Sequence, residues 1–186
     1  MLENIYLTIL IIVLLMFLDY FLTIKGFRLY KQKYSKFIEA ESYELNPNFK
    51  KSVNARKYNF LHLIGVIFVS AFIYAIYYLG TNNIFYFTKS SFFTCQGMLF
   101  SIFGFINMRH IQNIMIFKFV NKNPSMLSGK LKQKNSFTIY ASRISTFTFS
   151  IFLFFVFLLV PTSFTFGLAL GLFLFSFKQR RYDKKK

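Results

Sequence analysis

The chain has 186 residues and a net charge of +17, because 23 Lys and Arg residues face only six Asp and Glu residues. Hydrophobic residues make up 55% of it and gather in runs close to the length of about 20 apolar residues that spans a bilayer. This composition excludes an ordinary soluble domain, and the placement of the basic residues between the apolar runs argues against nucleic acid as a partner.

The first apolar run predicts a transmembrane helix over residues 5–23. No Lys or Arg precedes this run, whereas the segment 24–57 after it contains nine. Because basic loops remain in the cytoplasm, we expect the N-terminus outside and the loop 24–57 inside. The run is not typical of a cleaved signal peptide, since it also lacks a small-residue cleavage site.

Two further spans are predicted over residues 58–79 and 92–108. The connector between them carries one basic residue, Lys89, as an outside loop would. The segment 109–143 holds seven basic residues and no acidic one, which indicates a second cytoplasmic loop.

The last apolar block, residues 144–177, contains no charged residue. A single helix of this length would measure about 50 Å, which exceeds a hydrocarbon core of about 30 Å. Because Pro161 disfavours helix at the residue before it, we expect two spans, 144–160 and 163–177. A re-entrant hairpin is the alternative, and both arrangements leave the basic tail 178–186 in the cytoplasm.

Together these segments predict an all-α, polytopic transmembrane helix bundle, with about five spans, the N-terminus outside and the C-terminus inside. We expect one membrane domain over residues 1–186, located as a multi-pass protein in the cytoplasmic membrane of a prokaryote. The lipid bilayer is then its main partner, with anionic lipid at the basic cytoplasmic face.

Polar residues inside the predicted spans are the candidates for function. Asp19 comes first, because an ionisable group in a span is a functional hypothesis by default. Thr23 follows at i+4 on the same helix face. Arg109 and Arg143 are candidate partners at a similar depth, and a purely structural ion pair is the alternative interpretation.

The only two histidines, His62 and His110, fall near the cytoplasmic ends of their helices. With Asp19 they could form a metal site or a proton relay, or simply make hydrogen bonds at the interface. A dense polar cluster that could bind a lipid headgroup, line a vestibule or be a solvated helix end is formed by Asn107, Arg109, His110 and Asn113. No catalytic, cofactor or metal motif is present, so we expect no cofactor and no resident metal.

Small residues recur every four positions in the last predicted span, at Ser163, Gly167 and Gly171. This pattern allows two helices to approach closely in lipid. The partner helix could belong to the same chain, to a second copy in a homo-oligomer or to another protein.

Asp19 and Thr23 in the first span are followed by Glu44-Leu45-Asn46-Pro47 in the basic loop. This pattern resembles one in small prokaryotic polytopic membrane proteins whose function is not established. The resemblance covers about 30 residues and implies a membrane fold without a mechanism. Asn46 and Pro47 also predict the start of a helix.

The predicted spans, the small-residue pattern and the polar residues support three hypotheses about function. The first is a non-enzymatic subunit, scaffold or regulator that acts through helix contacts and a basic cytoplasmic face. The second is a transporter or channel component that uses Asp19, His62 and Arg109 at a polar cytoplasmic vestibule. The third is a membrane-embedded enzyme that acts on lipid, with Asp19 or a histidine as the acid–base group.

Overall fold

The computed structural model describes residues 4–40, 43, 47–55, 57–84 and 87–183. Its helices are α1 (Ile5–Tyr30), α2 (Pro47–Ala55), α3 (Phe60–Thr81), α4 (Lys89–Lys122), α5 (Asn135–Leu159) and α6 (Ser163–Asp183). Two short strands, β1 (Ile38–Ala40) and β2 (Leu131–Gln133), pair in parallel with Ile38 opposite Leu131. Single turns of 3₁₀ helix lie at Tyr34–Lys36 and Pro124–Met126. The predicted all-α helical fold is confirmed.

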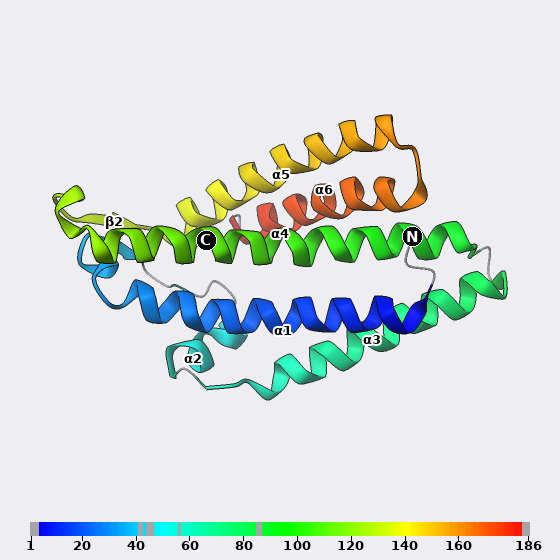
Figure 1. Ribbon diagram of the computed structural model, residues 1–186, viewed down its shortest axis with the longest axis horizontal. Helices are drawn as coiled ribbons and strands as arrows, with labels where there is room; N and C mark the ends of the chain where they lie inside the picture. The colour runs from blue at the N-terminus through cyan, green and yellow to red at the C-terminus, as the bar shows by residue number, and fades with distance from the viewer. Residues whose placement is uncertain (1–3, 41–42, 44–46, 56, 85–86, 184–186) are drawn as a thin grey trace.

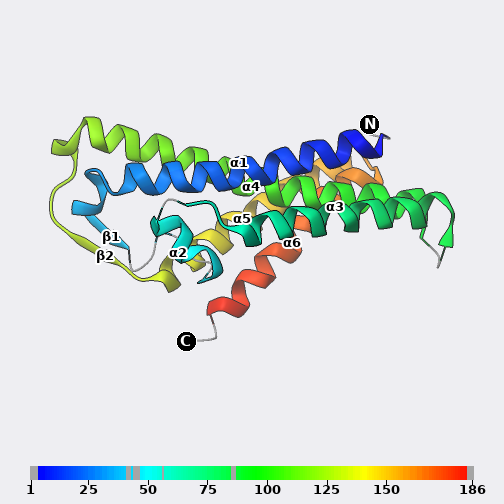
Figure 2. The ribbon, with the colours of Figure 1, turned by 90° about the horizontal axis from the view of Figure 1, so that it is seen from below.

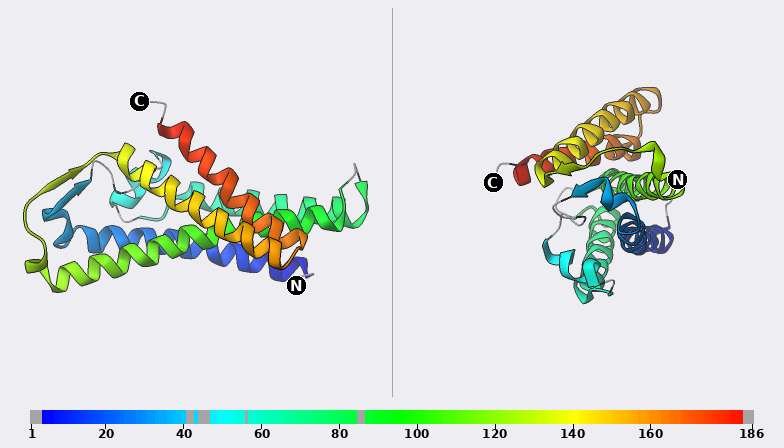
Figure 3. Two further views of the ribbon diagram at one scale, coloured as in Figure 1. Left: turned by 90° about the horizontal axis from the view of Figure 1, so that it is seen from above. Right: turned by 90° about the vertical axis from the view of Figure 1, so that its left-hand side faces the viewer.

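The long helix α4 forms the axis of the bundle, with α1 and α3 on one side and α5 and α6 on the other (Figure 1). Seen end-on, the two groups lie on opposite sides of α4 (Figure 3). The strands and α2 lie at one end of the bundle, and the N-terminus lies at the other (Figure 1). We call the end with α2, β1 and β2 the sheet end.

Four helices, α1, α3, α4 and α5, are long and apolar enough to cross a membrane. The apolar stretch of α6 is shorter, at Ser163–Gln179. Large apolar side chains point outward, as Phe68 on α3 and Leu159 on α5 do with 71% and 82% of their surface exposed. Such outward faces suit lipid better than water. The bundle is thus compatible with a multi-pass membrane protein, while the number of crossings and their direction remain predictions.

The helices continue past the predicted spans at the sheet end. Helix α1 runs to Tyr30, α4 runs to Lys122, and α5 begins at Asn135. With 34 residues, α4 is about 51 Å long, against about 30 Å for a hydrocarbon core. The sheet end therefore extends beyond an apolar layer of that thickness.

The predicted break at Pro161 is present, since α5 ends at Leu159 and α6 begins at Ser163. The backbone N–H of Thr165 donates to Thr162 Oγ1 at 3.1 Å, and the N–H of Thr162 donates to Thr165 Oγ1 at 3.1 Å. This reciprocal exchange is a capping box that fixes the start of α6. Pro47 likewise begins α2, while Asn46 lies outside the described residues.

Aromatic side chains pack the sheet end into a small cap. The ring of Tyr34 lies 4.6 Å from that of Phe117 on α4, and Tyr30 lies 5.6 Å from Tyr43. The hydroxyl of Tyr30 donates to Ile38 O at 3.0 Å and accepts from the N–H of Ala40 at 2.9 Å. Because these bonds tie β1 to α1, the basic segment after α1 is folded rather than extended.

Helices α4 and α6 approach each other closely at three glycines, Gly97, Gly167 and Gly171. A methyl group placed on Gly171 would lie 2.6 Å from Met98 Cα, and one on Gly97 would lie 2.9 Å from Leu168 N. At the first residue of α6, Ser163 Oγ lies 2.5 Å from Ser90 Oγ. The pattern Ser163, Gly167, Gly171 thus faces α4 of the same chain, where glycine lets the backbones meet.

Candidate functional site

A cavity of about 420 Å³ lies at the sheet end, and residues of all six helices line it. Its polar wall includes Asp19, Thr23, His62, Arg109, His110 and Ser142. Its apolar wall includes Phe49, Val53, Phe105, Ile106, Ile139 and Phe175. The cavity therefore offers charge and apolar surface side by side.

Asp19 and His110 form the centre of the polar wall. Asp19 Oδ1 lies 3.0 Å from His110 Nε2, and Thr23 Oγ1 lies 3.2 Å from the same nitrogen. Asp19 and Thr23 reach one imidazole because they lie one turn apart on α1. The two ionisable side chains keep 30% and 22% of their surface exposed, so the pair is only partly desolvated. Asp19 thus lies against His110, one of the two histidines that the sequence analysis grouped with it, rather than against Arg109, its first candidate partner.

His62 joins α3 to α1 at the wall of the cavity. Its Nε2 lies 3.1 Å from Met16 O, and its Nδ1 lies 2.9 Å from Tyr58 Oη. A carbonyl oxygen only accepts, so Nε2 carries the hydrogen, and Nδ1 of the neutral ring accepts from the hydroxyl. Because both ring nitrogens have hydrogen-bond partners, the His62 side chain is held in place and has a structural role in the wall of the cavity.

Arg109 reaches across the cavity from α4 to α5 and donates to Ser142 Oγ. Among the described residues, no carboxylate lies within ion-pair distance of its guanidinium. Lys178 on α6 lines the same cavity and is exposed. The cavity therefore brings together two cations that the sequence places almost 70 residues apart.

Two predicted residues lie elsewhere. Asn107 donates to Leu15 O at 2.9 Å and to Phe103 O at 2.8 Å, so it joins α4 to α1. Arg143 lies over the ring of Tyr140, 5.0 Å from its centroid, in a cation–π contact. Neither residue lines the cavity, which gathers Asp19, Thr23, His62, Arg109 and His110 from the predicted set.

The sequence analysis missed the contribution of α5. Ser142, Thr146 and Ser150 are all buried, while the large apolar residues of this helix point outward. Their spacing of four puts them on one face. This stripe of small polar residues was visible in the sequence, and it would have indicated which face of α5 meets the bundle.

Two buried polar atoms at the cavity have no hydrogen-bond partner among the described residues. They are His110 Nδ1 and Gln179 Oε1. Buried polar atoms are normally hydrogen-bonded, and an unpaired one calls for an explanation such as a ligand or water. His110 Nδ1 and Gln179 Oε1 are therefore available for hydrogen bonds with a bound molecule.

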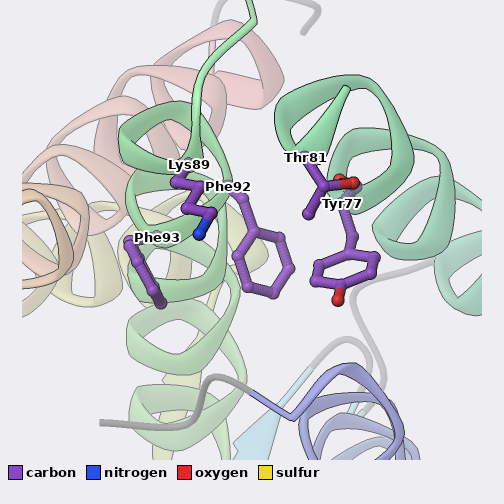
Figure 4. A pocket seen from close by; sticks show the side chains of 5 residues that line it. All are labelled: Tyr77, Thr81, Lys89, Phe92 and Phe93. Carbon is purple, nitrogen blue, oxygen red and sulfur yellow. The ribbon is translucent and has the colours of Figure 1, made fainter. Parts of the chain in front are cut away.

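A second cavity, of about 210 Å³, lies at the other end of the bundle between α3 and α4. Figure 4 shows the Lys89 side chain beside the rings of Phe92 and Phe93. The apolar cluster that joins α1, α3 and α4 includes Phe92 of this cavity and Met16, whose carbonyl contacts His62 of the large one. Packed apolar side chains thus lie between the two cavities.

The geometry at His110 differs from that of a catalytic triad. In a triad the base contacts the nucleophile through one ring nitrogen and the acid through the other. Here Asp19 and Thr23 both face Nε2. Among residues 4–40, 43, 47–55, 57–84 and 87–183, no three His, Cys, Asp or Glu side chains gather closely enough to hold a metal ion.

Comparisons of the chain with protein-family models, with curated proteins and with solved structures find no match. The chemistry of the cavity therefore rests on the geometry of its own residues.

Proposed function

We propose that this chain is a multi-pass membrane protein that binds a small ligand in the cavity at the sheet end and acts as a non-enzymatic subunit or regulator. The observation that carries the proposal is a cavity of about 420 Å³ with Asp19, Arg109 and Lys178 in its wall. Ligand sites in proteins measure about 300–1,000 Å³ and combine apolar walls with a few placed polar groups. The cavity fits this description.

The position of the cavity supports access from the cytoplasm. Asp19 lies about 21 Å along α1 from Ile5, in the far third of an apolar layer of about 30 Å that begins at Ile5. The exposed cations Lys25, Arg28 and Lys118 lie beyond it at the sheet end. The positive-inside rule puts such an end in the cytoplasm.

The glycine contact favours this binding role over a scaffold built on the same residues. Gly167 and Gly171 meet α4 of their own chain, so this face is not free for a partner protein. The cavity is then the feature that distinguishes the protein from an anchoring bundle.

The test is to fill the cavity. Ile139 lines it on α5, so Ile139→Trp should occupy part of its volume. Ile151→Trp is the matched control, because Ile151 lies on the same helix and is 43% exposed. Thermal unfolding in mild detergent is followed across acidic, basic and neutral solutes and a total bacterial lipid extract. We expect at least one addition to raise the Tm of the wild type and of Ile151→Trp, but not that of Ile139→Trp.

Two outcomes would overturn the proposal. One is that no addition raises the Tm of the wild type. The other is that Ile139→Trp responds as fully as Ile151→Trp, because the ligand would then bind outside the cavity.

Transport is the second candidate, favoured by the Asp19–His110 pair in the wall of the cavity. Ion-coupled transporters use such intramembrane pairs as proton relays. A transporter predicts that the ligand found by the stability screen enters proteoliposomes in the presence of the protein. A binding subunit predicts retention on the protein without uptake, which suits the apolar cluster between the two cavities.

A further inference from the structure

We propose that the ligand of this cavity is a phosphate ester with an apolar part, of the kind found in a phospholipid with hydroxyl groups on its headgroup. The inference rests on the proposed function, because it requires that the cavity binds a ligand. It adds the chemical class of that ligand and the residues that recognise it.

The charge of the described wall favours an anion. Arg109 and Lys178 supply two positive charges and Asp19 supplies one negative charge. The wall is positive whether His110 is neutral or protonated. A cationic solute would meet Arg109 and Lys178 without compensation, whereas a phosphate would neutralise them.

Arg109 has the geometry for a phosphate. A guanidinium carries five N–H donors in a planar fork that matches a phosphate in bidentate fashion, and Ser142 accepts from one end of it. Lys178 provides a second, flexible point charge from α6. Because Arg109 of α4 and Lys178 of α6 line the same cavity, we expect them to hold one phosphate together.

The remaining polar atoms suit hydroxyl groups on the same ligand. Gln179 Oε1 is a buried acceptor without a partner among the described residues, and Asp19 carries a second acceptor oxygen beside the one that faces His110. A hydroxyl donates to such groups, whereas the ionised phosphodiester of a phospholipid has no proton to donate. The wall therefore fits a ligand with both phosphate and hydroxyl, such as a glycerol headgroup.

The apolar wall accounts for the rest of the ligand. Phe105 and Ile106 of α4 and Phe175 of α6 line the cavity beside the cations. The last turns of α6 diverge from α4 (Figure 2). A water-soluble phosphate would leave these apolar side chains uncovered, whereas the upper part of an acyl chain would cover them and be removed from water.

The experiment measures dissociation constants of the detergent-purified full chain for three probes. These are short-chain phosphatidylglycerol, short-chain phosphatidylcholine and glycerol 3-phosphate, the last as a soluble source of the same headgroup. We expect phosphatidylglycerol to bind at least tenfold tighter than the other two. Arg109→Gln and Lys178→Gln should each weaken it about tenfold, which corresponds to about 1.4 kcal/mol. Lys178 is exposed, so its variant stays informative if Arg109→Gln fails to fold.

Arg28→Gln is the matched control, because Arg28 is an exposed guanidinium at the sheet end outside the cavity. It should keep the wild-type constant. An equal loss in Arg28→Gln would show general attraction to a basic surface and overturn the proposal. Equal dissociation constants for glycerol 3-phosphate and phosphatidylglycerol would overturn the proposal that the ligand has an apolar part. Binding that is lost in Ile139→Trp but unchanged in Arg109→Gln and Lys178→Gln would support the proposed function. It would overturn the proposal that the ligand carries a phosphate.

Discussion

At the scale of single residues, the polar groups of the spans act mostly as contacts between helices. Gln96 Nε2 donates to Thr8 Oγ1 at 2.7 Å, and Asn107 donates to a carbonyl of α1. Asp19 and His110 add a contact between a carboxyl group and an imidazole that joins the same two helices. Contacts of this kind contribute about 0.6 kcal/mol on average in membrane helix bundles. Arg109 differs, because it lines the cavity and no described carboxylate lies within ion-pair distance of its guanidinium.

A double-mutant cycle measures the contact between α1 and α4. Asp19→Asn and His110→Gln, singly and together, should give a coupling free energy of about 0.5–1 kcal/mol, because the pair is partly desolvated. The control is the pair Glu39–Lys130, whose side chains are 51% and 62% exposed and whose atoms lie 3.3 Å apart. Its coupling should be close to zero. A coupling close to zero for Asp19 and His110 in thermal unfolding would show that these two side chains do not depend on each other.

Sequence reasoning found Asp19 and Arg109 because a charge close to an apolar run stands out. It grouped Asp19 with both histidines, but it did not select His110, and it did not predict Ser142 as the partner of Arg109. The pairing of Asp19 with His110 depends on the register between α1 and α4, and that of Arg109 with Ser142 depends on how α5 crosses α4. Hydropathy predicts neither the register between α1 and α4 nor the way α5 crosses α4. Ser142 also gave no signal as a single small polar residue.

At the scale of helices, the apolar runs located every long helix but not its end. Hydropathy falls where Lys and Arg begin, yet α1 and α4 continue because their outer turns pack against each other through Phe27, Tyr30 and Phe117. Asn121 of α4 also accepts from the backbone N–H groups of Lys33 and Tyr34. In these outer turns aromatic residues that pack are interspersed with Lys and Arg residues. Their mean hydropathy is therefore low, and it does not predict that the helix continues.

The approach of α6 to α4 predicts the effect of single methyl groups. Gly97→Ala and Gly171→Ala should each lower the free energy of unfolding by about 1–3 kcal/mol, because the added methyl meets backbone atoms. Gly104→Ala is the control on α4, since nothing lies within 4 Å of a methyl there. It should be neutral or slightly stabilising. A loss in Gly104→Ala as large as in Gly97→Ala would mean that the close contact is not the cause.

At the scale of the whole molecule, both basic segments and the end of α6 lie in the half of the bundle with the sheet (Figures 1 and 2). This arrangement agrees with the sequence-based expectation that they share one side of the membrane. The direction of insertion is a prediction from the basic residues alone.

Single cysteines test that direction. Cys95 is the only cysteine, so Cys95→Ser provides the background. Asn82→Cys follows α3 at the end opposite the sheet, and Lys31→Cys follows α1 at the sheet end, and both positions are exposed. In intact cells a membrane-impermeant maleimide should label Asn82→Cys and spare Lys31→Cys. The reverse pattern would place the sheet end outside.

The central claim is that the cavity at the sheet end is open to ligand, and threonine-to-cysteine exchange on α5 tests it most directly. Thr138 lines the cavity, whereas Thr146 lies two turns deeper on the same face and is fully buried. Both variants are made in the Cys95→Ser protein and studied in membrane fragments that are accessible from both faces. A hydrophilic maleimide should label Thr138→Cys much faster than Thr146→Cys. Added phosphatidylglycerol should slow the labelling of Thr138→Cys. Equal rates at the two positions, or no protection by any bound ligand, would contradict the claim.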